Sequence, residues 1–428
     1  MNAAARQVYA AAAQLARLGA ALAPTDGSKL VRTFAARRGI RERYAEWARQ
    51  GRRSDRPLLW MHAPSVGEGL QARPVLELMR ARHPALQLAY TFFSPSAERF
   101  ASGLDVDFRD YLPFDTAGDA RAALAALSPH ALVFSKLDVW PVLAREAARQ
   151  GVKLGLVSAT LARDSSRGRG LAAMLLRDAY AQLDAVGAID SEDAERLVRL
   201  GVHERVVEVT GDTRFDQVWA RAANVGLGRP LIAPLVSERP TLVAGSTWPT
   251  DETHLLPAFA GCRGSTPAVR LIIAPHEPSP EHLRPIERWA AQERIPLARL
   301  GTPEASTADV VLVDRVGVLG DLYALADLAY VGGAFHSAGL HSVLEPAAFG
   351  VPVLFGPRHQ GTRDAGLLLR ADAAVAVTSR AELLDAANRW VQDPNARRAA
   401  GARARAVIEK GLGAAERSAH LVERLLGN

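Results

Sequence analysis

Short apolar runs bounded by turn residues alternate along the chain with longer stretches rich in Ala, Leu and Arg that have a helical period. In the first half these runs predict six strands, at residues 57–62, 86–91, 131–134, 153–157, 185–189 and 206–209. A second series predicts six more, at residues 241–244, 271–274, 309–313, 328–331, 352–355 and 374–377. Strands that alternate with helices in this way predict α/β domains, each with a parallel sheet covered by helices on both faces.

A break in this pattern divides the chain. Residues 224–240 contain Gly226, Gly228, Pro230 and Pro234, a density of Gly and Pro that predicts a linker. We therefore expect four segments: a basic amphipathic N-terminal segment (1–56), an N-terminal domain (57–222), the linker (223–240) and a C-terminal domain (241–428). Both domains are expected to be doubly wound, Rossmann-like α/β folds that face each other across a cleft.

The composition fits a large globular protein of two or three domains, with 428 residues of which 48% are hydrophobic and 23% charged. The single cysteine, Cys262, excludes an internal disulfide and fits a reducing compartment, so the cytoplasm is expected. The sequence has no run of 18 or more apolar residues and no recognisable signal peptide.

Positive charge is concentrated at the N-terminal end. Residues 1–56 contain twelve Lys and Arg against four Asp and Glu, a formal charge of +8, whereas the whole chain carries +6 and the remainder therefore −2. Because the remainder is slightly acidic, a nucleic-acid groove is not predicted.

The first part of this basic segment has the period of an amphipathic helix. Val8, Leu15 and Leu22 recur every seven residues, with Leu18 close by, and Arg17 falls about 180° away from them. Seven further arginines follow between residues 37 and 53. Such a helix can lie on an anionic membrane surface. The alternative is a helix that docks onto its own domain.

Chemically versatile residues gather where the predicted strands end. Ligands of parallel sheets bind beyond the carboxyl ends of the strands, so a site in the cleft is expected, with room for two substrates. His62, Ser65, Gly67 and Glu68 follow the first strand and open a helix. We expect Gly67 just before the helix start, where a glycine lets a ligand approach closely, and Glu68 near the helix N-terminus. Glu68 can act as a general base on a hydroxyl if partial burial raises its pKa toward neutrality; otherwise it is a capping carboxylate.

Lys136 and Asp138 follow another apolar strand. On an extended segment they lie on the same side. They can then form a surface ion pair, or together face an acidic group on a substrate.

Four loops in the second half combine small residues with hydroxyls and imidazoles, and each follows a predicted strand. Their backbone amides and the next helix start suit phosphate oxygens. Glu345 is expected about one turn into a helix opened by Gly339, where a carboxylate can accept both hydroxyls of a ribose. The candidate ligand-binding residues here are Ser246, Thr247, Pro275, His276, Gly332, Gly333, Gly339, His341, Ser342 and Glu345.

Three common signatures are missing from the sequence: the phosphate loop of P-loop enzymes, the Gly-x-Gly-x-x-Gly dinucleotide fingerprint, and a Cys/His metal framework. An ATPase, an NAD enzyme and a zinc enzyme are all disfavoured for this reason.

Taken together, these stretches resemble the Kdo transferases, the 3-deoxy-D-manno-octulosonic acid transferases that extend lipid A with sugar from CMP-Kdo. The resemblance runs from about residue 60 to residue 369. It is carried by short segments whose order and spacing are specific: 62–68 (HAPSVGE), 90–96 (YTFFSPS), 111–115 (YLPFD), 210–216 (TGDTRFD), 245–252 (GSTWPTDE), 274–278 (APHEP), 330–334 (YVGGA), 339–346 (GLHSVLEP) and 356–357 (GP).

The resemblance implies a GT-B fold, with the acceptor bound by the N-terminal domain and CMP by the C-terminal domain. It implies inverting transfer of Kdo to a lipid A precursor, lipid IVA, in lipopolysaccharide core biosynthesis, with no metal and no cofactor besides the CMP-Kdo donor. Glu68 becomes the general base, supported on the acceptor side by Ser65, Gly67, Lys136 and Asp138, and Glu345 the ribose ligand. The implied location is peripheral, on the cytoplasmic face of the inner membrane.

Two alternatives stay open. One is the same fold acting on another nucleotide sugar, as a UDP-sugar transferase or epimerase. The other is a non-catalytic protein that binds a membrane or a nucleic acid through its basic N-terminus.

Overall fold

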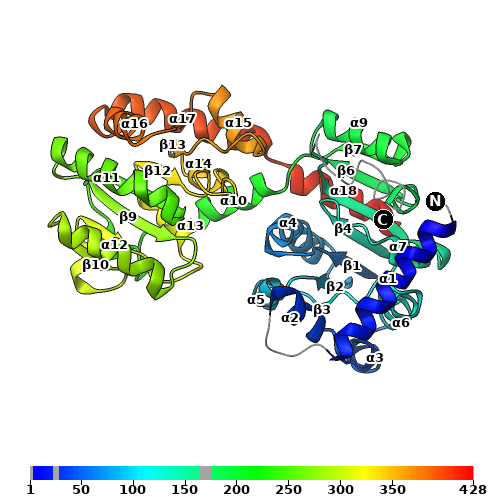
Figure 1. The fold of residues 1–428 in the computed structure, drawn as a ribbon. Helices are drawn as coiled ribbons and strands as arrows, with labels where there is room; N and C mark the ends of the chain where they lie inside the picture. Colours follow the sequence, from blue (N-terminus) through cyan, green and yellow to red (C-terminus); the bar gives the residue numbers. More distant parts are fainter. Residues whose placement is uncertain (1–2, 23–27, 163–175, 428) are drawn as a thin grey trace. The chain divides into compact units, whose positions relative to one another are not determined.

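The structure, a computed structural model, describes residues 3–22, 28–162 and 176–427. The chain divides into two compact units, one of Met1–Gln217 with Leu412–Asn428 and the other of Val218–Gly411. Each unit contains a seven-stranded sheet in which all neighbouring strands are parallel, with helices packed around it (Figure 1). The prediction of two doubly wound α/β domains is confirmed, and the cleft expected between them stays a prediction.

The first sheet has the strand order β3-β2-β1-β4-β5-β6-β7. Its strands are β1 (Leu58–His62), β2 (Gln87–Phe92), β3 (Phe108–Tyr111), β4 (Ala131–Ser135), β5 (Lys153–Ala159), β6 (Ala185–Ala188) and β7 (Val207–Val209). The helices of this unit are α1 (Ala3–Leu22), α2 (Lys29–Ala35), α3 (Ile40–Gln50), α4 (Val66–Arg82), α5 (Glu98–Ser102), α6 (Ala117–Leu127), α7 (Pro141–Arg149), α9 (Ser191–Leu200) and α18 (Ala414–Leu426), and α10 (Arg214–Asn224) crosses into the second unit. Successive strands move to one side from β1 and to the other from β4, so the order reverses between these two strands.

The second sheet has the order β10-β11-β9-β8-β12-β13-β14 and reverses between β8 and β12. Its strands are β8 (Thr241–Thr247), β9 (Arg270–Pro275), β10 (Leu297–Arg299), β11 (Val310–Leu312), β12 (Leu328–Val331), β13 (Val353–Phe355) and β14 (Ala374–Ala376). The helices are α11 (Pro249–Ser265), α12 (Pro280–Gln292), α13 (Leu319–Leu322), α14 (Leu344–Ala348), α15 (Arg363–Arg370), α16 (Arg380–Gln392) and α17 (Pro394–Gly411). Short 3₁₀ turns lie in both units: η1 (Pro95–Ala97) and η3 (Glu204–Val206) in the first, and η4 (Ala233–Leu235), η5 (Pro303–Ser306) and η6 (Tyr323–Leu325) in the second.

Both faces of each sheet are buried, which is why the strands read as continuous apolar runs. Successive residues of β9 belong to different apolar clusters: Leu271 and Ile273 pack with α11 and α16 on one face, whereas Ile272 packs on the other. Helices begin where a side-chain oxygen caps the first turn, as Ser279 caps α12 and Ser379 caps α16.

All twelve predicted strands are present, with ends shifted by up to three residues. The prediction missed β3 and β10, each of which is one of the two edge strands of its sheet. An edge strand has a solvent-facing side and needs no continuous apolar run, so β3 places Arg109 and Asp110 between two buried aromatic residues.

The predicted domain boundaries differ from the two compact units. Residues 1–56 are part of the first unit, and the dividing point lies at Gln217–Val218 inside α10 rather than at the Gly- and Pro-rich stretch 223–240. The predicted C-terminal domain also ended too late, because α18 belongs to the first unit. It packs on α4, β5 and β6 (Figure 1, red) and buries Leu421 and Val422 in the first core. Asp216 holds its start by accepting hydrogen bonds from the N–H groups of Gly413 and Ala415.

Several arginines of the basic N-terminal segment have hydrogen-bond or ion-pair partners within the first unit. Arg37 is buried and donates to the backbone oxygens of Thr33 and Leu112, under the ring of Phe93. Arg43 pairs with Asp110 and Arg41 with Asp119, while Arg38 and Arg52 donate to backbone oxygens. These cations therefore serve the packing of the first unit.

Helix α1 docks with its polar side. The Tyr9 hydroxyl donates to Asp115 at 2.7 Å, and Arg17 lies 3.0 Å from Asp119. On the opposite side, Val8, Leu15 and Leu18 are 64%, 69% and 61% exposed. We call these three residues the apolar stripe of α1. Within residues 3–22, 28–162 and 176–427, no helix has the length and apolar character needed to cross a bilayer.

Candidate active site

Glu68 lies at the reversal point of the first sheet, where β1 and β4 end side by side. The Ser65 hydroxyl oxygen caps α4 by accepting a hydrogen bond from Gly67 N at 3.3 Å, and its O–H donates to the Glu68 carboxylate. Because α4 begins at Val66, Gly67 lies inside the first turn and not ahead of the helix as expected. The Lys136 ammonium donates to Glu68 Oε1 at 3.1 Å. The predicted residues Ser65, Gly67, Glu68 and Lys136 are therefore together.

The loop after β4 turns Lys136 toward Glu68. Lys136 has a φ of +67°, a left-handed conformation that a non-glycine residue rarely adopts, and its N–H donates to Val157 O of β5 at 2.9 Å. The expected extended segment is thus wrong, because the chain turns here. Asp138 contacts other partners, His62 Nε2 at 3.4 Å and the indole N–H of Trp140 at 3.0 Å.

Two opposing effects determine the protonation of Glu68. Burial favours the neutral acid and by itself raises the pKa of the carboxyl group. The hydrogen bond from Ser65 and the positive charge of Lys136 favour the carboxylate and outweigh burial, so the pKa of Glu68 lies below its ordinary value. The expected upward shift toward neutrality is therefore wrong, because it considered burial without the partners. Glu68 is ionised throughout the neutral pH range.

A buried row of hydrogen bonds ties the Asp138 loop to the centre of the sheet. His62 is fully buried, with Nδ1 3.0 Å from the Thr91 hydroxyl, which also accepts the Trp60 indole N–H at 2.8 Å. On its other side, His62 Nε2 lies 3.2 Å from the Trp140 indole nitrogen. Sequence reasoning placed His62 in a motif without a role, and the structure assigns it to the framework of this loop.

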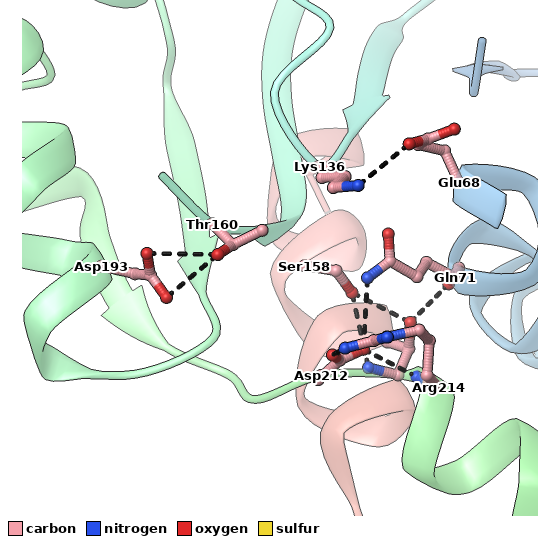
Figure 2. A network of polar contacts seen from close by, with 9 residues as sticks. Glu68, Gln71, Lys136, Ser158, Thr160, Asp193, Asp212 and Arg214 are labelled. Carbon is pink, nitrogen blue, oxygen red and sulfur yellow. Dashed lines mark hydrogen bonds and ion pairs between the residues drawn. The ribbon is translucent and has the colours of Figure 1, made fainter. Parts of the chain in front are cut away.

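A second polar group lies one turn along α4 from Glu68 (Figure 2). Gln71 donates to Asp212 at 3.2 Å, and the Arg214 guanidinium donates to the same carboxylate at 2.8 Å. Thr213 donates to the backbone oxygen of Gln71 and lies 2.9 Å from Ser158. Burial alone would raise the pKa of Asp212, but Arg214 and the hydrogen bonds lower it. Sequence reasoning assigned no role to these residues, although Gln71 follows Glu68 at the spacing of neighbours on a helix face.

The second unit repeats this arrangement at the reversal point between β8 and β12. Ser246 has a φ of +54°, and the pairing of β8 with β9 shifts register between Gly245 and Thr247, which marks a bulge. Thr247 is buried, and its hydroxyl donates to Glu252 at 2.8 Å. The bulge turns the end of β8 toward the loop after β12, where Gly332 N donates to Gly245 O at 2.9 Å.

Close backbone contact explains the glycines of these loops. A Cβ on Gly332 would lie 2.3 Å from Ser246 O, and a Cβ on Gly333, whose φ is +95°, would lie 2.1 Å from Gly339 O. The buried carboxylate of Asp251 joins the loops, since it accepts hydrogen bonds from Trp248 N and Gly333 N at 2.9 and 2.8 Å. It also accepts the hydroxyl of Tyr330 at 2.9 Å and the N–H of Phe335 at 3.3 Å. Sequence reasoning missed Asp251, whose only signal was its place three residues after Trp248 at a helix start.

Four rings stack beside these glycines. Trp248 stacks on His336 with ring centroids 4.1 Å apart and on His276 at 4.8 Å, and His276 stacks on His341 at 4.5 Å. The two predicted histidines are thus neighbours, and Trp248 and His336 join them without having been predicted. In the part of the chain that the structure describes, no three or more His, Cys, Asp or Glu side chains are grouped to hold a metal ion.

The remaining predicted residues lie around the same loops. Pro275 is the buried last residue of β9, Ser342 is exposed, and Glu345 is the second residue of α14. The helix expected to open at Gly339 is wrong, because the chain stays irregular until Leu344. Burial and the nearby charge of Asp321 raise the pKa of Glu345, against the lowering effect of Arg221.

The family model of 3-deoxy-D-manno-octulosonic-acid transferase (kdotransferase) matches residues 38–217. The chain is 31% identical to the 3-deoxy-D-manno-octulosonic acid transferase of Bordetella pertussis, over 90% of this chain and 91% of the relative. The chain belongs to the Kdo transferase family. The corresponding transferase of Chlamydophila psittaci is 29% identical over 72% of this chain and 71% of its own length. The predicted family and enzyme class are thus confirmed: this Kdo transferase is a glycosyltransferase, which removes the non-catalytic alternative.

Solved structures agree on the fold. The UDP-GlcNAc 2-epimerase of Neisseria meningitidis bound to UDP-GlcNAc matches the Kdo transferase with a TM-score of 0.63 at 15% identity, covering 87% of this chain and all of that chain, 100%. The S. aureus MnaA–UDP structure matches with a TM-score of 0.60 at 12% identity, over 87% and 97% of the two chains. At this identity the likeness concerns the fold alone, and the expected GT-B fold class is confirmed.

Proposed function

We propose that the enzyme transfers Kdo from CMP-Kdo to the lipid A precursor lipid IVA with inversion, in lipopolysaccharide core biosynthesis. The first unit holds the acceptor and the second the nucleotide. The observation that carries this proposal is the ionised Glu68 carboxylate, held by Ser65 and Lys136 at the reversal point where ligands of such sheets bind. Family membership supports the choice of sugar.

Glu68 is the proposed general base. The acceptor hydroxyl oxygen bonds to the anomeric carbon, the bond from that carbon to the phosphate oxygen breaks, and CMP leaves with the electron pair. The hydroxyl proton goes to Glu68, whose low pKa keeps it in the accepting form before transfer. Lys136 and Asp138 are the proposed charged groups on the acceptor side of the site. No metal or cofactor takes part.

The second unit supplies the proposed donor site. Backbone amides around Gly332 and Gly333, the hydroxyls of Ser246 and Ser342, and the imidazoles of His276 and His341 surround the phosphate. Thr247 and Pro275 are buried beneath these loops, and the backbone of Gly339 lies in close contact with Gly333. Glu345 accepts the ribose hydroxyls.

The test of the catalytic role uses labelled CMP-Kdo, lipid IVA and purified protein. Glu68→Gln should lower kcat by about 10²–10⁴-fold, because only the base is removed, and should leave the affinity for CMP unchanged by calorimetry. The matched control is Glu77→Gln on the same helix, where Glu77 is exposed and pairs with Arg73; it should keep full turnover. Full turnover in Glu68→Gln would remove Glu68 from the proposed role, and tighter binding of UDP than of CMP would refute the donor.

We also propose peripheral binding to the cytoplasmic face of the inner membrane through the apolar stripe of α1. The supporting observation is that Val8, Leu15 and Leu18 face solvent while the polar side of the same helix is docked. An amphipathic helix presented in this way inserts its apolar side between headgroups. The cations Arg37, Arg41 and Arg43 contribute less than the sequence predicts, because they have partners inside the unit.

Vesicles of phosphatidylglycerol and phosphatidylethanolamine test this binding. Replacing both Leu15 and Leu18 by Ser should weaken sedimentation with vesicles at least about tenfold, since burying each leucine is worth roughly 1–2 kcal/mol. Leu227→Ser is the control, because Leu227 is also half exposed but lies in the second unit. Equal binding by all three proteins would contradict the proposal.

A further inference from the structure

One hydrogen bond in the second unit determines the form of a candidate ligand-binding histidine. The indole nitrogen of Trp248 lies 3.1 Å from Nε2 of His341. A tryptophan N–H can only donate, so Nε2 of His341 must be the acceptor and carries no proton. The neutral imidazole then has its single proton on Nδ1, the opposite side of the ring.

The groups around His341 also oppose a positive charge on it. His276 stacks on it from the end of β9, and His336, in the loop after β12, stacks on Trp248. Asp251, at the start of α11, acts in the opposite direction and favours the cation. Burial and the two histidines outweigh Asp251 and lower the pKa of His341 to about 4. His341 is therefore neutral at pH 7.

The proton-bearing side of His341 is available to a ligand. Across residues 3–22, 28–162 and 176–427, Nε2 has the Trp248 partner and Nδ1 has no hydrogen bond. The side chain is half-buried and lies against Gly333, where the loops after β8 and β12 meet. An N–H without a partner at this position is a ready donor to an anionic oxygen.

We propose that Trp248 is a positioning residue that holds His341 in its neutral Nδ1–H form, so that His341 presents an N–H donor and not a cation to a phosphate oxygen of the nucleotide. The nature of the ligand rests on the function proposed above. The tautomer rests on the Trp248 contact alone.

Two-bond proton–nitrogen NMR spectra of the ¹⁵N-labelled full-length protein test the tautomer directly. The chain has 11 histidines, and His341→Gln identifies the signal. The wild-type signal should show Nδ1 protonated at pH 7. A protonated Nε2 or a cationic ring would overturn the proposal without any variant of Trp248.

Trp248→Phe keeps an aromatic ring between His276 and His336 and removes the indole N–H. The variant should show a mixture of tautomers, and the protonation constant of His341 should rise about fivefold, the loss expected for one neutral hydrogen bond. Trp289→Phe, at a partly buried position against the core on α12, should leave the His341 signal unchanged. An unchanged tautomer in Trp248→Phe would overturn the proposal.

Calorimetry with CMP tests what the tautomer does. At pH 8 the affinity of Trp248→Phe should be about fivefold lower than that of the wild type, since the donor is no longer pre-oriented. At pH 4.5 the ratio of the two affinities should narrow, because about half of the variant's His341 rings are then protonated and carry an N–H on Nδ1. Equal affinities at both pH values would overturn the ligand contact. No CMP binding to either protein, with the wild-type tautomer as stated, would support the tautomer and refute the proposed donor.

Discussion

Removing the charge of Lys136 should raise the pKa of Glu68. The two groups are 3.1 Å apart, and the side chains of Lys136 and Glu68 are 44% and 17% exposed. Lys136→Met keeps the length of the side chain and deletes the ammonium group. Burial, which favours the neutral acid, is then opposed mainly by the Ser65 hydrogen bond.

The size of this shift follows from the distance. Two unit charges 3.1 Å apart attract by about 1.3 kcal/mol at the dielectric constant of water, and this value suits a half-exposed lysine better than an interior one. That energy corresponds to a rise of about one pKa unit in the variant. A carboxylate whose pKa is lowered by folding stabilises the fold at any pH above its pKa in the unfolded chain. That contribution is lost as the pH falls through its pKa in the folded protein. The variant should therefore gain less stability from Glu68 near pH 5 than the wild type does.

Two measurements check the prediction: a ¹³C titration of the Glu68 carboxyl and the pH profile of kcat/KM. Both should show the acid limb of the variant about one pH unit higher, as the Coulomb estimate requires. Lys153→Met is the matched control, because Lys153 also pairs with a carboxylate, Asp184 at 3.2 Å, and is 56% exposed, but lies at the start of β5. The reasoning is refuted if the Glu68 titration in Lys136→Met stays in place or moves to lower pH.

Three further substitutions test the buried carboxylates. Asp251→Ala leaves four donors without their acceptor and should lower the free energy of unfolding in urea by about 3–5 kcal/mol; a loss below about 1 kcal/mol would contradict its role in joining the loops. Tyr9→Phe removes one of three donors to Asp115 and should cost about 1.5 kcal/mol by the same assay. Arg214→Met leaves Asp212 without its cation and should destabilise the protein at pH 7 by about 1–3 kcal/mol. Because the pKa of Asp212 is lowered in the fold, the difference in free energy of unfolding between the wild type and Arg214→Met should narrow below about pH 4. A difference that does not change with pH would argue against the ion pair.

Local pattern and composition were sufficient for the central strands. Strands β1, β4, β8 and β12 are buried on both faces, so each needs a continuous apolar run that is visible in the sequence. The positions of Glu68 and the Gly332–Gly333 turn followed from the same reasoning, because residues that follow central strands gather at one edge of the sheet.

Features that depend on long-range contact were not predictable in this way. α18 has the same pattern whichever sheet it covers, and only its packing on β5 and β6 assigns it to the first unit. The two sides of α1 likewise cannot be assigned from periodicity, because the docking of Tyr9 and Arg17 decides that the apolar stripe faces solvent.

The sequence by itself determined the fold class, the family and the loops that carry chemistry, since these depend on residue type and order along the chain. The tertiary structure decided the protonation of Glu68 and the tautomer of His341. Each depends on a partner far away in sequence, Lys136 acting together with the neighbouring Ser65 for Glu68, and Trp248 for His341. A pKa or a tautomer is a property of distances between groups, and those distances exist only once the chain has folded.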